Sequence, residues 1–389
     1  MNPLIDGSWR QARALAFSTC APTPTEVIPL AHAQGRSLAA HIDALVDLPT
    51  DTTSAMDGYA VAGPGPWEIV GEISTSAPHT SELSNGTAVR ISTGGVIPGN
   101  TFGIIRWEDA EIHGTQLSGT AIKAKDIRPA GLECTRGERI AQAGTVINPG
   151  MIGLLAATGI DDLHVHRRPK IALVLTGDEL IRHGAPGAGL VRDSIGTMLP
   201  GWLEKLGCEV ISVRYINDLR SETVAALLEQ MATVDLIITT GGTARGAHDH
   251  MHDALSDISA QMLIDGVLVR PGHPMFLAKR QKVGILGLPG NPQSAITALM
   301  TLGEPMARAL LGQELSQVEL LERVPTRIDL RAPDDSTRLI LGTLRAGNFE
   351  MGSHLGSGML RGLAFSTGFA VVPPGGAATG ELVEWLALP

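Results

Sequence analysis

The chain has 389 residues, of which 43% are hydrophobic and 3% aromatic, and its formal net charge is −10. This length is too great for a single compact core, so we expect about three domains or a split domain. The acidic balance and the scarcity of aromatic side chains argue against nucleic acid or an anionic membrane as the main partner. The three cysteines are scattered, and no apolar signal core or apolar window of about eighteen residues occurs, which predicts a cytoplasmic protein.

The N-terminal part predicts a scaffold that the chain leaves and later rejoins. Helices are expected at 8–17 and 32–42, on either side of an extended piece from Glu26 to Leu30. The chain is expected to rejoin this scaffold later, through extended sequence from Gly131 and a strand-like run from Asp162 to His166.

Between these segments, short β-runs separated by turn residues predict a small β-rich domain. The runs are Trp67–Gly71, Ala88–Ser92, Gly103–Trp107 and Thr120–Ala124. A polar loop before them, residues 48–57, can present Ser54 and Asp57 at a surface, and an ordinary surface loop is the alternative. Thr93 lies in a second loop, between two of the strands.

From Lys170 onward, strands and helices alternate, which predicts a doubly wound parallel sheet. The expected strands are Ile171–Leu175, Glu209–Ile216, Asp235–Thr240, Gly266–Arg270 and Lys282–Gly287. The expected helices are Ser194–Leu206, Ser221–Met231, His250–Ile258 and Pro292–Leu310. Pro200 should kink or split the first helix, and Asn291 should act as the N-cap of the last. Short β-runs and a short helix after Ser336 predict a small β-barrel or sandwich.

Polar segments follow four of these strands. They are Thr176-Gly177-Asp178-Glu179, Asn217-Asp218, Thr240 to Asp249, and Leu288-Pro289-Gly290-Asn291-Pro292. Because ligands bind beyond the carboxyl ends of parallel strands, we expect a ligand site at this edge. The Gly241-Gly242 pair can cradle an anion with its backbone N–H groups, and a tight turn without a ligand is the alternative. Acids beside such a loop suggest a divalent cation that offsets phosphate charge.

A run of histidines next to this loop resembles a metal site. His248, His250 and His252 share one face of an extended strand, and the first and last of them share one face of a helix. A short His-rich tract is compositional evidence only, so we favour a solvated helix start in which Asp249 complements the helix dipole.

Several motifs, in matching order and spacing, resemble the molybdopterin molybdenumtransferases of the MoeA and gephyrin E-domain type. The motifs are Ser54-Ala55-Met56-Asp57-Gly58-Tyr59-Ala60-Val61, Thr176-Gly177-Asp178-Glu179-Leu180, Thr240-Gly241-Gly242 with Asp249, and Leu288-Pro289-Gly290-Asn291-Pro292. The likeness runs from about residue 8 to the Gly352-Ser353-His354 segment. It implies a multidomain fold with a MogA-like doubly wound α/β domain and a C-terminal β-barrel. The domain ranges expected are 1–45 with 131–168 for the scaffold, 46–130 for the β-rich domain, 169–312 for the α/β domain, and 313–389 for the barrel.

The resemblance also implies an activity, which is insertion of molybdate into adenylylated molybdopterin with release of AMP, aided by Mg²⁺. It implies a homodimer in which Asp57 and Thr93 of one chain complete the site of the other, and a recipient molybdoenzyme or its chaperone as a possible partner. Glu179, Asp218 and Asp249 would hold the cation or molybdate and, with Asp57, carry catalysis. The cofactor-binding residues expected are Thr240, Gly241, Gly242, Arg245, Asp193, Ser194, Arg270, His273, Pro289, Gly290, Asn291, Pro292, Ser54 and Thr93.

The sequence departs from the family pattern at several polar positions. Arg245 lies in the glycine loop where the family has Val-Ser-Val, and Arg270 and His273 replace two lysines. Arg139 stands where an acid is usual, and Ile195 replaces the asparagine expected after Asp193. Two alternatives therefore stay open beside a working enzyme: a non-catalytic carrier or chaperone that binds molybdopterin, and insertion of another oxyanion such as tungstate.

Overall fold

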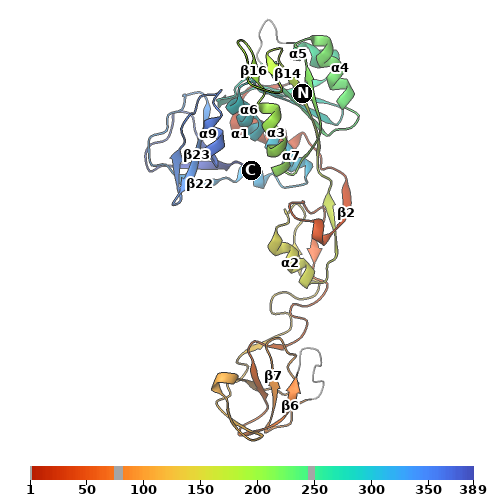
Figure 1. Ribbon diagram of the computed structural model, residues 1–389, viewed down its shortest axis with the longest axis vertical. Coiled ribbons are helices and arrows are strands. Elements are labelled where there is room, and N and C mark those ends of the chain that lie inside the picture. The colour runs from red at the N-terminus through yellow and green to blue at the C-terminus, as the bar shows by residue number, and fades with distance from the viewer. Residues whose placement is uncertain (1, 74–81, 244–249) are drawn as a thin grey trace.

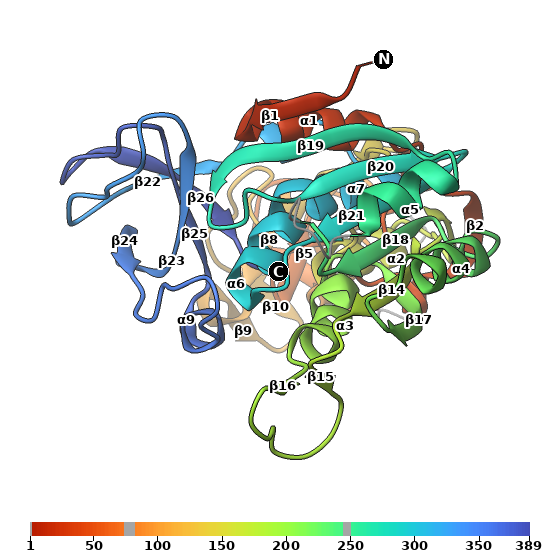
Figure 2. The ribbon, with the colours of Figure 1, turned by 90° about the horizontal axis from the view of Figure 1, so that it is seen from above.

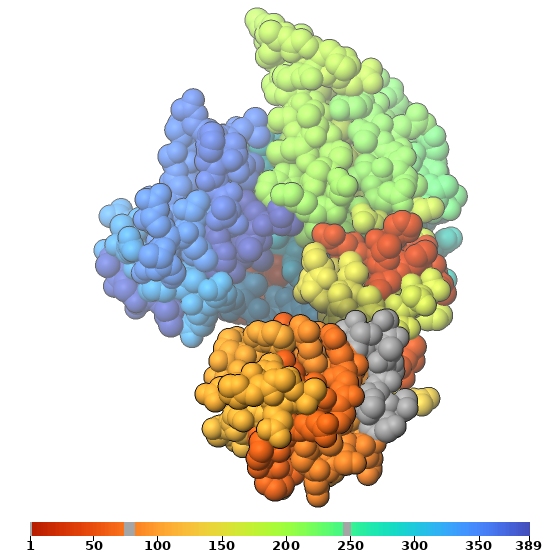
Figure 3. Space-filling model, turned by 60° about the horizontal axis from the view of Figure 1, so that its bottom comes forward, coloured from red at the N-terminus to blue at the C-terminus, as the bar shows by residue number. Residues whose placement is uncertain are grey.

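The computed structural model describes residues 2–73, 82–243 and 250–389 of an elongated molecule. An α/β body and a C-terminal barrel lie at one end, a small body lies in the middle, and a β-rich body forms the other end (Figure 1). Seen toward that far end, the β-rich body is a rounded lobe distinct from the rest of the molecule (Figure 3). Over the described residues, no helix has both the length and the apolar character needed to cross a bilayer.

The centre of the α/β body is a four-stranded parallel sheet in the order β17-β14-β18-β21. These strands are β14 (Lys170–Thr176), β17 (Glu209–Ile216), β18 (Leu236–Thr240) and β21 (Val283–Leu288). Side chains of β14 alternate between two apolar cores: Leu173 packs with α3 (Ile195–Lys205), whereas Val174 packs with α4 (Arg220–Gln230) and α5 (Met251–Asp257). Helices therefore cover both faces of the sheet, and the predicted doubly wound α/β fold is confirmed.

The sheet continues past β21 in a mixed arrangement that the sequence did not predict. β20 (Phe276–Arg280) pairs antiparallel with both β21 and β19 (Gln261–Arg270), and β1 (Leu4–Ser8) pairs parallel with the outer side of β19. β20 and β21 form a tight hairpin with Gln281 at φ +56°, and no glycine or asparagine at that position marks the turn in the sequence.

The helix expected at Pro292–Leu310 is present as three consecutive segments. They are α6 (Pro292–Ala298), a π-helical turn (Leu299–Gly303) and α7 (Glu304–Leu310). Asn291 occupies the N-cap position, but its side chain makes no capping hydrogen bond, contrary to the prediction. Pro200 also lies inside α3 without splitting it, because Leu199 and Leu203 anchor the helix in the core on either side.

The first helix, α1 (Trp9–Ser18), packs on the α/β body and not on the scaffold. The Trp9 indole donates to Thr301 Oγ1 at 3.1 Å, and the buried Arg13 guanidinium bonds the Met300 carbonyl and the Glu304 carboxylate. These contacts reach Met300 and Thr301 in the π-helical turn and Glu304 at the start of α7. We therefore propose that residues 4–18 belong with the α/β domain and that the scaffold begins after Ser18.

The middle body has its own small apolar core. Its elements are β2 (Thr25–Pro29) paired with β13 (Asp162–His166), β3 (Ile42–Asp43) paired with β12 (Arg139–Ala141), the 3₁₀ turn Leu30–His32, and α2 (Pro149–Ala157). The helix predicted at 32–42 is wrong. Gly35 has φ +72°, and the backbone after it bonds across to Ile147 and Thr145, so this segment is held by distant chain and not by its own turns.

The β-rich body is built on a six-stranded sheet in the order β8-β5-β7-β6-β10-β9. Its elements are β5 (Gly58–Val61), β6 (Trp67–Ile73), β7 (Thr87–Ile91), β8 (Gly103–Arg106), β9 (Glu111–His113), β10 (Gln116–Ser118), the 3₁₀ turn Trp107–Asp109, and the pair β4 (Thr53–Ser54) and β11 (Ile127–Arg128). The β-rich prediction is confirmed, but the run at Thr120–Ala124 is not a strand.

The C-terminal body has the strand order β24-β23-β25-β26-β22. The elements are α8 (Ser316–Glu319), β22 (Glu322–Pro325), β23 (Thr337–Arg345), β24 (Asn348–Met351), α9 (Arg361–Phe365), β25 (Gly368–Val372) and β26 (Leu382–Ala387). A bridge between Thr326 and Phe349 joins the end of β22 to β24, which closes the sheet into the predicted small barrel. β23 also pairs with the end of β19, so the barrel is attached to the α/β body.

Candidate functional site

The loops after β14 and β17 are held together by their acidic residues. The backbone N–H of Asp218 donates to Asp178 Oδ1 at 3.1 Å, and the N–H of Asp178 approaches Asp218 Oδ2 at 3.4 Å. The Thr176 hydroxyl also donates to the Asp218 carboxylate. Asp178 and Asp218 are both exposed. The two loops thus form one acidic rim at the carboxyl edge of the sheet, as the strand order requires.

Glu179 joins this rim from the start of a protruding arm. A Cβ placed on Gly177 would lie 3.0 Å from Glu179 Oε2, so the carboxylate folds back over that glycine. The arm leaves through β15 (Leu180–Ile181) and returns through β16 (Val191–Arg192), and the Val191 N–H donates to the Glu179 carbonyl at 2.8 Å. Figure 2 shows the arm extending away from the body. The backbone of Glu179 is therefore fixed while its carboxylate stays exposed.

The glycine pair after β18 lies against the first of these loops. Gly241 has φ +82°, its N–H donates to the Leu288 carbonyl at 3.1 Å, and a Cβ on it would meet the Thr176 carbonyl at 3.1 Å. Only glycine suits this backbone. Thr240 is buried, Gly242 has φ +63°, and the rest of this loop, including Arg245, His248 and Asp249, lies outside the described residues.

The loop after β21 completes the edge. Pro289 is buried, Gly290 and Asn291 are exposed, and Pro292 begins α6. A segment of the barrel, residues 353–360, lies over this helix start: the Gln293 N–H donates to the Ser357 carbonyl at 2.9 Å. The site is thus bounded on one side by the C-terminal body.

Asp193 and Ser194, predicted as ligand contacts, lie at the start of α3. Asp193 is buried, and its carboxylate accepts from the Tyr215 hydroxyl at 2.7 Å and the Gly196 N–H at 2.9 Å. Ser194 is the N-cap residue and makes no side-chain capping bond. Ile195 is buried in the core, so the residue that departs from the family pattern serves packing here. The Asp193 carboxylate therefore joins the end of the arm to β17.

Burial of the phenol and its hydrogen bond to Asp193 raise the pKa of Tyr215 to about 12. The chain has only two tyrosines, so in Tyr59→Phe the remaining phenol can be followed alone by absorbance. We expect it to ionise near pH 12 in the folded protein and near pH 10 after unfolding in urea. A raised pKa stabilises the fold below pH 10, and this stability is lost as the pH rises through 12. Titration near 10 in a sample whose circular dichroism is still native would contradict the buried contact.

Arg270 is the last residue of β19, and His273 lies in the loop that follows. His273 Nε2 is 2.9 Å from Asp6 Oδ1, so it is paired with β1. Arg270 lines a cavity of about 520 Å³ between the α/β body and the barrel, together with Gln293, Arg331 and Arg338. Leu339, Leu341 and Leu355 form part of its apolar wall.

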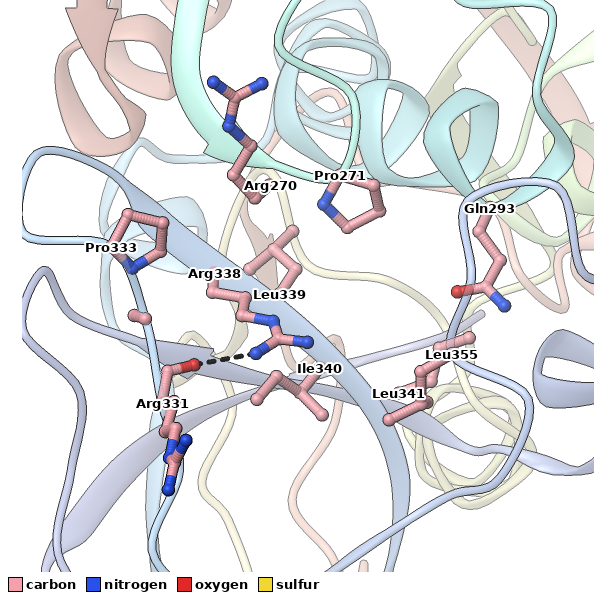
Figure 4. Close-up of a pocket in the computed structure, with 11 residues that line it drawn as sticks. Arg270, Pro271, Gln293, Arg331, Pro333, Arg338, Leu339, Ile340, Leu341 and Leu355 are labelled. Carbon is pink, nitrogen blue, oxygen red and sulfur yellow. Dashed lines mark hydrogen bonds between the residues drawn. The ribbon is translucent and has the colours of Figure 1, made fainter.

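Figure 4 shows how the polar side chains of this cavity lie. Arg338 extends into it, with its Nη1 donating to the Arg331 carbonyl at 3.0 Å, while the guanidinium groups of Arg270 and Arg331 are directed toward opposite rims. Arg331, Arg338 and Gln293 were not predicted as site residues. The sequence holds no signal that joins them to Arg270, because the barrel reaches this place only through the pairing of β23 with β19.

Asp57 and Thr93 lie together in the β-rich body, far from the acidic rim within one chain (Figure 1). The Thr93 N–H donates to Asp57 Oδ1 at 2.7 Å, and the hydrogen bonds from Thr93 lower the pKa of Asp57. Ser54 is fully buried, and its hydroxyl donates to the Met56 carbonyl at 2.6 Å. Asp57 is therefore an exposed, ionised carboxylate, while Ser54 shapes the loop that presents it.

The remaining candidates lie elsewhere. Arg139 lies on β12 of the scaffold, 3.2 Å from Asp43, and does not approach the rim. His252 pairs with Asp265 at 3.2 Å, and His250 precedes α5. Within 2–73, 82–243 and 250–389, no three His, Cys, Asp or Glu side chains form a group that could hold a metal ion. That search does not reach His248 or Asp249.

Three family models match consecutive parts of the chain. They are the MoeA N-terminal region (domain I and II) at residues 8–159, a probable molybdopterin binding domain at 172–309, and the MoeA C-terminal region (domain IV) at 323–388. The molybdopterin molybdenumtransferase of Haemophilus influenzae is 32% identical over 302 residues, which cover 75% of this chain and 74% of the relative. The chain belongs to the molybdopterin molybdenumtransferase family.

Two further comparisons extend this family assignment over the full length. The Nostoc sp. molybdopterin molybdenumtransferase is 29% identical over 389 residues, covering 94% of this chain and 89% of the relative. The crystal structure of a MoeA protein from Pyrococcus horikoshii OT3 has a TM-score of 0.84 at 24% identity and covers 98% of this chain and all of that one, 100%. The multidomain fold of this family member is therefore that of MoeA.

Proposed function

We propose that this protein is an enzyme of molybdenum cofactor biosynthesis that inserts molybdate into adenylylated molybdopterin and releases AMP. The observation that carries the proposal is the meeting of four loops at one sheet edge, where the Asp178–Asp218 pair, Glu179 and the Gly241 turn lie beside the start of α6. A pure binding protein has no need of three exposed carboxylates at the place where it holds a phosphate. Family membership supports a molybdopterin-related substrate, and the acidic rim supports chemistry on it.

The donor chemistry of the rim fits Mg²⁺, which takes carboxylate oxygens together with substrate phosphate oxygens. Glu179 and Asp218, with Asp249 from the undescribed part of the loop, would hold the ion. When bound, it would neutralise charge on the phosphates and polarise the bond that breaks. The Gly241 N–H is held by the Leu288 carbonyl, so the N–H of Gly242 would bind the phosphates, and the Thr176 hydroxyl orients the Asp218 carboxylate.

The cavity beside α6 supplies a positively charged contact close to this rim. Asn291 lies at the same edge of the sheet as the acidic rim. Gln293, two residues further on at the start of α6, lines the cavity. Arg338 reaches into the cavity and carries a fixed positive charge, which suits phosphate or molybdate oxygens. Arg270 adds a second charge at the cavity rim in place of the lysine expected there.

Arg338→Met is expected to weaken binding of AMP about tenfold, because it removes charge-assisted hydrogen bonds to the phosphate. Arg345→Met is the matched control, since Arg345 lies on the same strand, β23, but at its exposed end beside Glu350. Isothermal titration calorimetry measures both dissociation constants. Equal weakening by both substitutions, or none by Arg338→Met, would show that the cavity is not the anion site.

A homodimer is part of the proposal. Asp57 lies in the β-rich body and the acidic rim lies in the α/β body, and these two bodies are at opposite ends of the elongated molecule (Figure 1). We propose that the Asp57 loop of one subunit, with Thr93, faces the rim of its partner, so that two such sites form under twofold symmetry. Delivery of the product to a recipient molybdoenzyme or its chaperone, and a cytoplasmic location, remain predictions from the sequence.

The test is to incubate the full-length chain with adenylylated molybdopterin and Mg²⁺, with molybdate, with tungstate or with neither, and to quantify AMP. We expect AMP release that depends on molybdate. Tight pterin binding without AMP release in any arm would favour the carrier or chaperone alternative. Release that is faster with tungstate than with molybdate would favour the other oxyanion.

A further inference from the structure

Gln293 is a buried polar residue in the wall of the cavity between the α/β body and the barrel. Only 2% of its surface is exposed, and it lies in the first turn of α6. Its side-chain Nε2 donates to the His354 carbonyl at 2.6 Å and to the Met359 carbonyl at 2.9 Å, both in the barrel segment that covers the helix start. The amide therefore fastens this segment to α6.

These two bonds also fix which way the amide faces. Backbone carbonyls can only accept hydrogen bonds, so the nitrogen of Gln293 must face His354 and Met359, and its Oε1 must take the opposite side. Figure 4 shows Oε1 on the cavity side of the amide. Among the described residues, no donor is hydrogen-bonded to this oxygen. The cavity wall thus presents an acceptor, Gln293 Oε1, whose position is fixed by the two hydrogen bonds of the amide nitrogen and which can accept a hydrogen bond from a ligand.

The cavity therefore offers two unlike polar groups. Arg338 reaches into it as a cationic donor, Gln293 Oε1 is an acceptor on another wall, and Leu339, Leu341 and Leu355 line it with apolar surface. A bare molybdate dianion can use the arginine, but it has no hydrogen to donate to the acceptor. A volume of about 520 Å³ lies in the range of pockets for organic ligands. The combination suits a phosphate joined to a heterocycle that carries an amine.

We propose that Gln293 is a specificity-determining residue whose Oε1 accepts a hydrogen bond from the exocyclic amine of a heterocycle linked to phosphate, while Arg338 binds the phosphate. This assignment rests on the proposed function, whose substrate carries such an amine on its adenine and another on its pterin. A polar site of this kind discriminates between ligands, because an analogue without the amine has no donor to offer this acceptor.

Two ligand pairs test the assignment on the full-length protein by calorimetry. The first pair is AMP and purine riboside 5′-monophosphate, which lacks the amine of adenine. The second pair is 6-hydroxymethylpterin phosphate and its analogue without the 2-amino group. We expect the wild-type chain to prefer the amine-bearing member of one pair about five- to tenfold, and that pair identifies which half of the substrate occupies the cavity.

Two substitutions separate the acceptor from the fastening role. Gln293→Met removes the acceptor and the two donated bonds, whereas Gln293→Lys keeps a donor for the His354 and Met359 carbonyls, removes the acceptor and adds a positive charge that acts on both members of a ligand pair alike. We expect the ratio of the two dissociation constants within the preferred pair to fall to about one in both variants. A purely structural role would weaken both members of a pair equally and leave their ratio unchanged.

No preference in the wild type for either pair, or a preference that survives in both variants, would overturn the assignment. AMP release is measured independently of these binding constants, so that failure of the proposed function can be told apart from failure of the Gln293 assignment. If preference and its loss are observed without turnover, Gln293 keeps its role in a binding protein and the proposed function fails. Turnover without any preference leaves the function intact and removes Gln293 from recognition.

Discussion

Glu179→Gln is expected to lower the rate of AMP release by about two orders of magnitude. The Glu179 carboxylate is exposed on the acidic rim and folds back over Gly177, next to the loop that Asp218 and Asp178 tie together. The amide is nearly the same size but carries no charge, so it cannot offset the charge of Mg²⁺ or hold the ion equally well. The measurement is kcat at saturating Mg²⁺, molybdate and substrate.

Glu209→Gln is the matched control for this prediction. Glu209 is also exposed, but it starts β17 and lies at the amino end of the same parallel sheet. We expect its variant to release AMP at the wild-type rate. Normal turnover by Glu179→Gln, or an equal loss in both variants, would remove Glu179 from the reaction.

Glu304→Leu is expected to lower the free energy of unfolding by about 3–5 kcal/mol. Glu304 and Arg13 are buried side chains with 3% and 4% exposure, and their charged atoms are 2.9 Å apart. Burial lowers the pKa of Arg13, while Glu304 opposes this shift. Without Glu304 the guanidinium stays buried and keeps the Met300 and Val318 carbonyls and the Trp9 ring as partners, but no carboxylate that offsets its charge. Urea denaturation followed by circular dichroism measures the loss.

The double variant Arg13→Met with Glu304→Leu provides the control. It replaces the buried pair by apolar side chains of similar length, and this kind of replacement is often neutral or stabilising. We therefore expect the double variant to recover most of the stability lost in Glu304→Leu. A double variant as unstable as the single one would show that the loss comes from packing or from the Arg308 partner that both variants lack, and not from the unpaired charge of Arg13.

The parts of the fold that the sequence predicts well are those encoded locally. β14 and β18 are unbroken apolar runs, and their order in the chain places Thr176, Asp218 and Thr240 at one edge of the sheet. The order of these parallel strands is therefore sufficient to place the residues of the acidic rim next to one another. The missed hairpin strand at Phe276 ends in Lys279 and Arg280, which obscure its β pattern.

Contacts between distant segments could not be predicted in this way. Arg338 and Arg270 share a cavity because β23 pairs with β19, and no local pattern specifies that pairing. Likewise α1 is amphipathic, but only the structure shows that its Arg13 reaches the π-helical turn. The segment after Leu30 contains good helix formers, yet it is drawn into extended pairing with Ile147 and Thr145.

A mixed dimer of two inactive variants measures most directly whether the reaction uses the rim of one subunit and Asp57 of its partner. Glu179→Gln and Asp57→Asn chains, carrying different affinity tags, are coexpressed, and the heterodimer is purified through both tags. One of its two sites then has an intact rim facing an intact Asp57, so we expect about half of the wild-type rate of AMP release while each homodimer stays inactive. A folded heterodimer that releases no AMP would contradict the account.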